Sequence, residues 1–310
     1  SRRLTVTTKE IVGSGKYTYE VDYHWAKLPE GWSMPAAAVF GDSQDKVYCF
    51  NRDPDHPIVI FDREGNYLSS WGGGLFAFPH AIILDKEDNV WLVERNNGQI
   101  MKFTKDGELL FTLGEKGFRS DTGADNTDFG SNGWQLVTHG GAPFNLPAGI
   151  ALNDAGEIFV ADGYANARVH KFAADGTHLL SWGEPGSGPG EFQLPHGAWI
   201  DSRGRLLIMD RENDRIQVFS QDGEHLDSWD TKLIGGAVVC VDNEDIVYCV
   251  EHNGGLVSIM DLDGKRLAQW GSMTHRSCHG VWVDSHKDLY IVEPYEGSQG
   301  RTVVKFTRKG

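Results

Sequence analysis

Long apolar runs and paired cysteines are both missing from this chain of 310 residues. No apolar stretch approaches the roughly 18 residues that a membrane-spanning helix needs, and residues 1–9 contain no apolar signal-peptide core. We therefore expect no membrane partner. The four cysteines show no C-x-x-C spacing, which argues against a structural zinc finger or a redox pair. We expect buried free thiols, with a cross-strand Cys240–Cys249 disulfide as the alternative.

Basic residues are in the minority. The chain has 29 Lys and Arg against 44 Asp and Glu, a formal net charge of −15. A surface of that sign repels phosphate backbones, so we expect no nucleic-acid partner. Hydrophobic residues make up 40% of the chain, which is enough for a sizeable core, and the composition predicts a folded globular protein rather than a disordered one.

A unit of about 40 residues recurs along the chain, most clearly over residues 76–114, 144–183 and 192–229. Each unit contains four short runs rich in β-branched and aromatic residues, separated by D-x-x-G or D-G turns. That pattern is typical of successive antiparallel hairpins. Four strands in each repeat form one blade of a β-propeller, so the fold class is predicted to be all-β.

One anchor residue marks the start of each repeat. It follows a proline or its equivalent, and the anchors are Ala36, His80, Ala148, His196, Ala237 and His279. Five blade-sized steps between them predict a six-bladed propeller that forms a single domain over residues 1–310. One step is longer because of a Gly, Asp, Asn and Ser-rich insertion at about 115–143. The last repeat holds only three strands, so an N-terminal strand over 18–26 is predicted to close the last blade.

Histidine and alanine alternate at the anchor position. His80, His196 and His279 belong to blades two, four and six, which lie about 120° apart in a six-fold ring, so their side chains should converge on the axis. Three imidazoles with an open fourth position suit a catalytic zinc ion, and another divalent transition metal also accepts them. The alternative is that each histidine only bonds a backbone carbonyl at the start of a strand.

The loop between the second and third strands of a blade opens on the same face as the anchors, so its side chains can reach the axis. These loops contain Arg52, Tyr164, Arg211 and His252. An arginine can bind a carboxylate through two parallel hydrogen bonds, and a tyrosine can transfer a proton. Arg52 and Tyr164 are therefore candidate catalytic residues. Asp162, Asp210 and Glu251 end second strands, and we interpret them as structural groups that bond turn amides.

The repeats resemble NHL repeats, and the chain resembles the catalytic core of peptidyl-α-hydroxyglycine α-amidating lyase over about residues 36–306. The most similar stretches are PHAIILDKEDNVWLVE (79–94), VADGYANARVHKF (160–172), WGEPGSGPGEFQLPHG (182–197) and MDRENDRIQVF (209–219). The resemblance implies a zinc held by the three anchor histidines, with Arg52 and Tyr164 assisting cleavage of a carbinolamide into an amide and glyoxylate.

Several positions depart from the pattern of that family. Gly280 follows His279 where the family has an aspartate of a structural calcium site, so we do not expect calcium. Ser277 stands where the family has a methionine of the substrate pocket, and we predict a pocket formed by Ser277, Arg211 and His252. Asn145 and Ala165 replace one cysteine pair of the family, which suits a reducing compartment and predicts a cytoplasmic protein.

Two functions follow from these observations. The first is a metal-dependent lyase of the amidating-lyase type, or a related hydrolase, that acts on a polar small molecule or a peptide end. The second is a non-catalytic propeller that binds a protein or peptide on one face. The three histidines favour the enzyme, because a binding platform has no need of convergent imidazoles. The sequence gives no oligomeric state.

Overall fold

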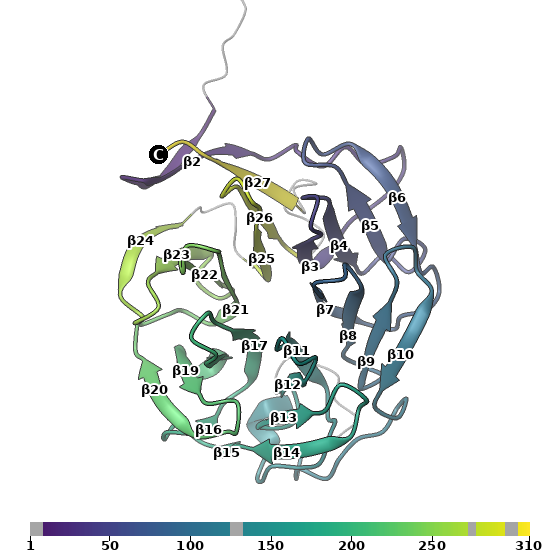
Figure 1. Ribbon diagram of the computed structural model, residues 1–310, viewed down its shortest axis with the longest axis vertical. Helices are drawn as coiled ribbons and strands as arrows, with labels where there is room; N and C mark the ends of the chain where they lie inside the picture. The colour runs from purple at the N-terminus through teal and green to yellow at the C-terminus, as the bar shows by residue number, and fades with distance from the viewer. Residues whose placement is uncertain (1–8, 125–132, 272–276, 295–302) are drawn as a thin grey trace, which may run out of the picture.

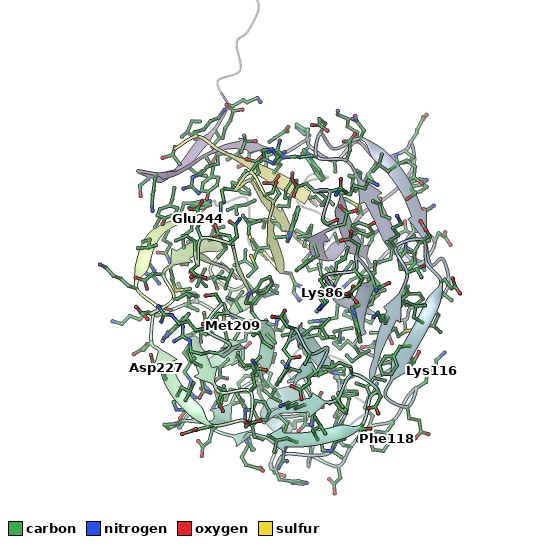
Figure 2. All side chains as sticks on the ribbon, in the orientation of Figure 1. Lys86, Lys116, Phe118, Met209, Asp227 and Glu244 are labelled. Carbon is green, nitrogen blue, oxygen red and sulfur yellow. The ribbon has the colours of Figure 1, made fainter. Side chains whose placement is uncertain are left out.

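A computed structural model describes residues 9–124, 133–271, 277–294 and 303–310. Six antiparallel sheets stand around a central channel like the blades of a propeller (Figure 1). Side chains fill the space between the blades, and Met209 lies inside the ring of sheets whereas Lys116 and Asp227 lie at its periphery (Figure 2). The prediction of an all-β propeller with six blades is confirmed.

The strands of each blade follow one another from the channel outward. Blade one comprises β3 (Ala36–Gly41), β4 (Val47–Asn51), β5 (Ile58–Phe61) and β6 (Tyr67–Trp71). Blade two comprises β7 (Pro79–Leu84), β8 (Val90–Glu94), β9 (Gln99–Phe103) and β10 (Leu109–Leu113). Blade three comprises β11 (Pro147–Leu152), β12 (Ile158–Asp162), β13 (Arg168–Phe172) and β14 (His178–Trp182).

The second half of the ring repeats this order. Blade four comprises β17 (Pro195–Ile200), β18 (Leu206–Asp210), β19 (Arg215–Phe219) and β20 (His225–Trp229). Blade five comprises β21 (Gly236–Val241), β22 (Val247–Glu251), β23 (Leu256–Met260) and β24 (Arg266–Gly271). Blade six comprises β25 (Gly280–Val283), β26 (Leu289–Val292), β27 (Val303–Arg308), β2 (Tyr17–Asp22) and β1 (Ile11–Ser14).

Short elements join the blades. A parallel pair, β15 (Glu184–Pro185) and β16 (Glu191–Phe192), lies between blades three and four. Two 3₁₀ helices, η1 (Gly133–Leu136) and η2 (Arg211–Asn213), occur within the described residues. No helix in these residues is long and apolar enough to cross a membrane.

The same side-chain turn links the first and second strands of every blade. An Asp or Asn oxygen accepts hydrogen bonds from the amides two and four residues later, because this geometry lets a short side chain replace a backbone acceptor. The six residues are Asp42, Asp85, Asn153, Asp201, Asp242 and Asp284. The turn residues that mark the repeat in the sequence therefore fix the hairpin beside the channel.

Buried acids at the ends of the second strands hold the segments that lead into the first strands. Asp162 accepts from the amide of Asn145, Asp210 from that of Gln193 and Glu251 from that of Ile234. Each of these amides belongs to the residue three positions before an anchor. The interpretation of Asp162, Asp210 and Glu251 as structural groups is confirmed.

The N-terminal segment closes the ring as predicted, with different bounds. The predicted strand covered 18–26, whereas β2 spans Tyr17–Asp22 and pairs antiparallel with β27. A further outer strand, β1, pairs with β2 and was not predicted. Arg63 of blade one also binds Asp284 and Asp288 of blade six, at 2.8 and 2.5 Å. The chain thus joins its two ends by strand pairing and by ion pairs.

The anchor of blade one is Ala37 rather than Ala36. In the strand pairing Ala36 lies opposite Asn51, as Pro79 lies opposite Glu94 and Pro195 opposite Asp210. Ala36 is therefore equivalent to the residue before the anchor in the other blades. The prediction was wrong by one residue because three consecutive alanines follow Pro35, and nothing in their chemistry distinguishes them.

Residues 125–132 of the insertion predicted at about 115–143 lie outside the described residues. Its described parts pack beside blade three. The Thr122 hydroxyl donates to the carbonyl of Ala165 at 2.7 Å, and the Asn145 amide donates to the carbonyl of Ser120 at 3.0 Å. Trp134 packs against an apolar cluster that includes Tyr164. The insertion therefore supports the loop after β12.

All four cysteines are buried free thiols, as predicted. Cys240 pairs with Tyr248 and Cys249 with Val239 across the hairpin, so the two cysteines do not face each other. The alternative of a cross-strand disulfide is wrong.

Ring closure should contribute strongly to stability through Tyr19 of β2. Its side chain is fully buried, lies 5.2 Å from the ring of Trp270 in blade five, and accepts a hydrogen bond from Arg308. We expect Tyr19→Ala to lower the free energy of unfolding by about 3–5 kcal/mol, as for other buried aromatic truncations. Urea denaturation followed by tryptophan fluorescence measures this loss.

Thr18→Ala is the matched control, because Thr18 is the neighbouring residue of β2 and points to the partly exposed face. Its expected cost is about 1 kcal/mol or less. Equal costs for the two variants would show that β2 does not stabilise the ring.

Candidate metal centre

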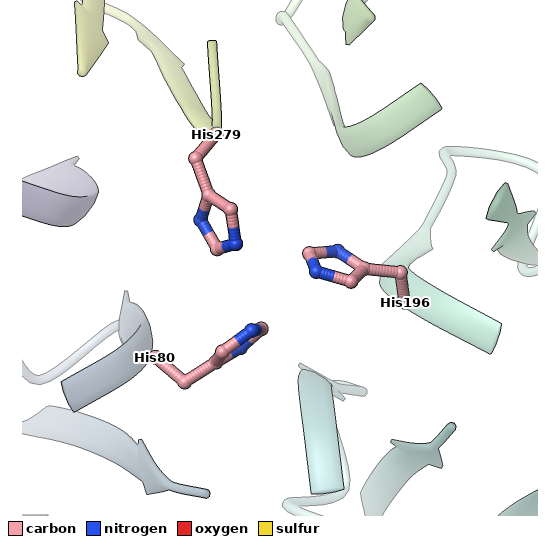
Figure 3. A group of neighbouring side chains, drawn as sticks. All are labelled: His80, His196 and His279. Atoms are coloured by element: carbon pink, nitrogen blue, oxygen red, sulfur yellow. The ribbon is translucent and has the colours of Figure 1, made fainter. Parts of the chain in front are cut away.

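Three imidazole rings meet in the central channel. His80 lies in β7, His196 in β17 and His279 directly before β25. The rings point toward one another from three blades (Figure 3). Their centroids are 4.8, 4.9 and 4.9 Å apart, and one nitrogen from each ring lies within 4.8 Å of the others. The near-equal separations show the trigonal arrangement that alternate blades impose.

A carbonyl of the next blade around the ring orients each histidine. The Nδ1 atoms of His80, His196 and His279 lie 2.6, 2.7 and 2.7 Å from the carbonyl oxygens of Ala148, Ala237 and Ala37. Because a carbonyl only accepts, Nδ1 carries the proton and Nε2 keeps its lone pair. The hydrogen bond to a backbone carbonyl, which was the alternative to metal binding, is present in all three histidines. It uses Nδ1 and leaves Nε2 available.

The surroundings keep the imidazoles neutral. Burial lowers the pKa of each of the three well below its ordinary value, since a charged ring loses its hydration. Neighbouring positive groups add to this effect, including Arg95 and Arg52 at His80 and Arg211 at His196. A neutral imidazole is the form that binds a metal.

The donor set fits a metal such as zinc. The Nε2 atom of His279 is buried and has no hydrogen-bond partner among the described residues. Leaving a buried acceptor unpaired costs free energy, which a metal ion would recover. In metal-binding histidines, one ring nitrogen binds the metal and the other typically donates a hydrogen bond that orients the ring. All three imidazoles have this second bond, from Nδ1 to a backbone carbonyl. The three residues therefore have the chemistry of a metal-ligand set with an open position.

Tyr164 reaches the histidines from the loop after β12. Its oxygen lies 3.0 Å from Nε2 of His80 and 3.0 Å from Nε2 of His196, and the side chain is 3% exposed. Because both nitrogens carry lone pairs, the hydroxyl proton can be donated to either of them. The tyrosine thus contacts two of the three imidazoles.

Two predicted arginines lie beside this group. Arg52 follows β4, its Nε donates to the carbonyl of Pro79 at 3.4 Å, and its guanidinium lies 4.1 Å from the ring centroid of Phe78. Arg211 begins η2 and lies 3.4 Å from the Tyr164 oxygen. The structure brings both arginines to the same end of the channel as the histidines.

Sequence reasoning missed Arg95. It follows Glu94, the last residue of β8, as Arg52 follows Asn51 and Arg211 follows Asp210. Its guanidinium lies 4.6 Å from the ring centroid of Tyr164 and 3.9 Å from that of Phe78. The repeat itself could have identified it, because an arginine stands at this position in blades one, two and four.

The other predicted pocket residues lie farther from the centre of the channel. The ring of His252 is 5.8 Å from that of His279, and its Nδ1 lies 3.3 Å from the carbonyl oxygen of Cys278. Burial lowers the pKa of His252 to about 4. Ser277 is partly buried beside it. At Gly280 a Cβ would lie 3.0 Å from the Cα of Ala38, so the chain passes close to blade one there.

Relatives in sequence support the fold. A family model described as a 6-bladed beta-propeller matches residues 135–253. NHL repeat-containing protein 3 of Homo sapiens is 31% identical over 66% of this chain and 57% of its own length. A probable peptidyl-alpha-hydroxyglycine alpha-amidating lyase of Caenorhabditis elegans is 31% identical over 54% of this chain and 45% of its own length.

A second lyase relative, peptidyl-alpha-hydroxyglycine alpha-amidating lyase 1 of Drosophila melanogaster, is 33% identical over 52% of this chain and 28% of its own length. The chain thus matches between about a quarter and somewhat more than half of the length of these three relatives.

Solved structures share the architecture at low identity. A gluconolactonase of Xanthomonas campestris has a TM-score of 0.66 at 13% identity, with 94% of this chain and 90% of that chain covered. A streptogramin B lyase has a TM-score of 0.60 at 14% identity, with 96% and 90% covered. At such identities the likeness shows the fold alone. The chain is a six-bladed β-propeller whose sequence relatives include NHL-repeat proteins and peptidyl-α-hydroxyglycine amidating lyases, at about 30% identity over about half of its length.

Proposed function

We propose that this protein is a metal-dependent lyase of the amidating-lyase type, which cleaves the C–N bond of a carbinolamide. The observation that carries the proposal is the set of three Nε2 lone pairs that face one another in the channel, each fixed by a bond from Nδ1 to a carbonyl. The lyase relatives support the reaction type. The substrate would be a small polar molecule or the end of a peptide.

Zinc is the metal we propose, since three neutral imidazoles with an open position suit it. A bound zinc ion would act as a Lewis acid that lowers the pKa of a hydroxyl group beside it. The protein's own contribution is to hold the imidazoles neutral and correctly oriented. The carbonyls of Ala37, Ala148 and Ala237 orient the rings without adding charge to the site, and burial keeps the rings neutral.

Tyr164 is the residue that we propose for proton transfer. In a carbinolamide the hydroxyl loses its proton, the oxygen forms a carbonyl with the carbon, and the C–N bond breaks as the amide nitrogen gains a proton. A tyrosine oxygen 3.0 Å from two imidazoles, with Arg211 3.4 Å away, can donate its own proton to the leaving amide nitrogen as it accepts the proton of the substrate hydroxyl, which restores the phenol. Arg52 is the residue that we propose to bind a substrate carboxylate, and its contacts with Phe78 and Pro79 at the same end of the channel support this role.

Metal content tests the site. We expect the purified protein, loaded with zinc and then dialysed, to hold about one ion for each chain, and His279→Ala to lose it, because two imidazoles bind zinc much more weakly than three. Elemental analysis by mass spectrometry measures both. His24→Ala is the control, since His24 is exposed and outside the channel. Full zinc occupancy in His279→Ala would contradict the proposed ligand set.

Glyoxylate release from an N-acyl α-hydroxyglycine tests the reaction. We expect Tyr164→Phe to lower kcat by about 10²–10⁴, the range for loss of a general acid or base, with the metal content unchanged. Tyr67→Phe, on the outer strand β6, should keep the activity of the unaltered protein. A folded, zinc-loaded protein that releases no glyoxylate would exclude this substrate.

A further inference from the structure

The residue three positions after each anchor lies at the end of the channel opposite the histidines. Each first strand runs from the anchor end to a hairpin, and this residue stands near the end of the strand. Blades one, four and six carry an aromatic side chain there, whereas blades three and five carry a small one. In blade order the six residues are Phe40, Ile83, Ala151, Trp199, Cys240 and Trp282.

Aromatic rings meet across this end of the channel. Blades one and four lie opposite each other in a six-fold ring, yet the ring centroids of Phe40 and Trp199 are 6.2 Å apart. Phe40 also lies 6.3 Å from Trp282 of blade six. Separations of this size are typical of aromatic contacts. The rings of blades one, four and six therefore narrow the channel at the end away from the histidines.

A cavity of about 510 Å³ opens beside these rings, among blades two, three and four. Ala151 lines it at the repeat position where blades one and four carry an aromatic ring, so its small side chain leaves room. The volume falls in the range of about 300–1,000 Å³ that is usual for small-molecule sites. A smaller cavity, of about 210 Å³, is lined by Cys240, the small residue of blade five. The apolar walls of the larger cavity include Phe40, Ile83, Trp91, Leu152, Trp199 and Ile200.

Polar side chains that line the larger cavity already have partners. Asp85 accepts a hydrogen bond from Nε1 of Trp91 at 3.0 Å and forms an ion pair with Lys102 at 3.0 Å. The Asn153 amide donates to Glu157 at 2.6 Å. Among the described residues, no buried polar side-chain atom without a hydrogen-bond partner belongs to the lining. An apolar ligand would therefore fill the cavity without separating a polar pair.

Charged side chains of both signs surround the same cavity. A charged ligand of either sign would meet groups of like charge, and an anion would meet the larger number of them. These charges therefore favour an uncharged ligand. The charged residues of the lining are Lys86, Lys102, Asp85, Glu87 and Asp154.

We infer that this cavity binds an uncharged aromatic molecule, which packs against the rings of Phe40 and Trp199 and the apolar side chains around Ala151. The histidines take no part. The part of the channel that is lined both by them and by Phe40 and Trp199 has a volume of only about 40 Å³, enough for a few water molecules. The site is thus separate from the proposed metal centre.

N-Phenyl-1-naphthylamine is a suitable probe, because it is uncharged at neutral pH and fluoresces strongly only in apolar surroundings. Fluorescence titration of the zinc-loaded protein should show saturable binding of about one molecule for each chain. The related 1-anilinonaphthalene-8-sulfonate has the same rings and one negative charge, so it should bind about fivefold more weakly. Removal of zinc with a chelator should change the affinity for the uncharged probe by less than about twofold, since the two sites are separate.

Ala151→Phe gives blade three the residue that blade one carries at this position, and it fills the cavity. We expect it to weaken binding of N-phenyl-1-naphthylamine at least about tenfold, because ring and probe compete for one volume. Leu152→Gln keeps the space but replaces an apolar wall, and should weaken binding about fivefold. Leu179→Gln is the matched control, because Leu179 is 49% exposed on β14 and outside the lining. It should leave the affinity within about twofold.

Absence of saturable binding to the unaltered protein would overturn the proposal, as would tighter binding of the sulfonate than of the uncharged probe. Loss of binding on removal of zinc would place the probe at the histidines and also contradict it. If Ala151→Phe does not fold, Leu152→Gln decides: weaker binding than in Leu179→Gln supports the cavity, and equal binding refutes it. None of these results depends on glyoxylate release, so the lyase function is tested separately.

Discussion

The bond from each imidazole to a carbonyl of the next blade is the interaction on which the site depends. It joins blade two to three, four to five, and six to one. The last of these bonds links His279 to Ala37, which are 242 residues apart in the chain, across the point where the ring closes. The arrangement of the three histidines is therefore complete only when blade six meets blade one, and the pairing of β2 with β27 completes blade six.

Radial repetition made much of this site predictable. The repeat length predicts the number of blades, and the alternation of histidine with alanine predicts that three side chains meet on the channel axis. Single-residue register was less predictable, because the alanines at 36, 37 and 38 are chemically alike, and only the pairing with Asn51 identifies the anchor. The strand β1 has little burial and so left no apolar pattern in the sequence.

Arg95 shows a second feature that the sequence predicts only in part. The repeat predicts that Arg95 occupies the same position in its blade as Arg52 and Arg211 do in theirs. Its contacts with Phe78 of blade two and Tyr164 of blade three depend on side-chain packing, which the repeat does not predict. Net charge was misleading at this scale. The total of −15 led us to expect no nucleic-acid partner, but this total averages over a channel end where the guanidinium groups of Arg52, Arg95 and Arg211 gather. Local fields, rather than the total, decide which small molecules approach the imidazoles.

The three histidines are arranged with near-threefold symmetry, but their surroundings are not symmetric. The three histidines are nearly equivalent, since their ring centroids are 4.8–4.9 Å apart. Of the three, Tyr164 contacts His80 and His196, and the insertion between blades two and three packs against the loop that carries this tyrosine. The Nε2 of His279 is thereby left without a partner among the described residues. The repeated blades thus supply three nearly equivalent imidazoles, and the loop that carries Tyr164 makes their surroundings unequal. A ligand bound at the axis would therefore meet Tyr164 beside His80 and His196, but not beside His279.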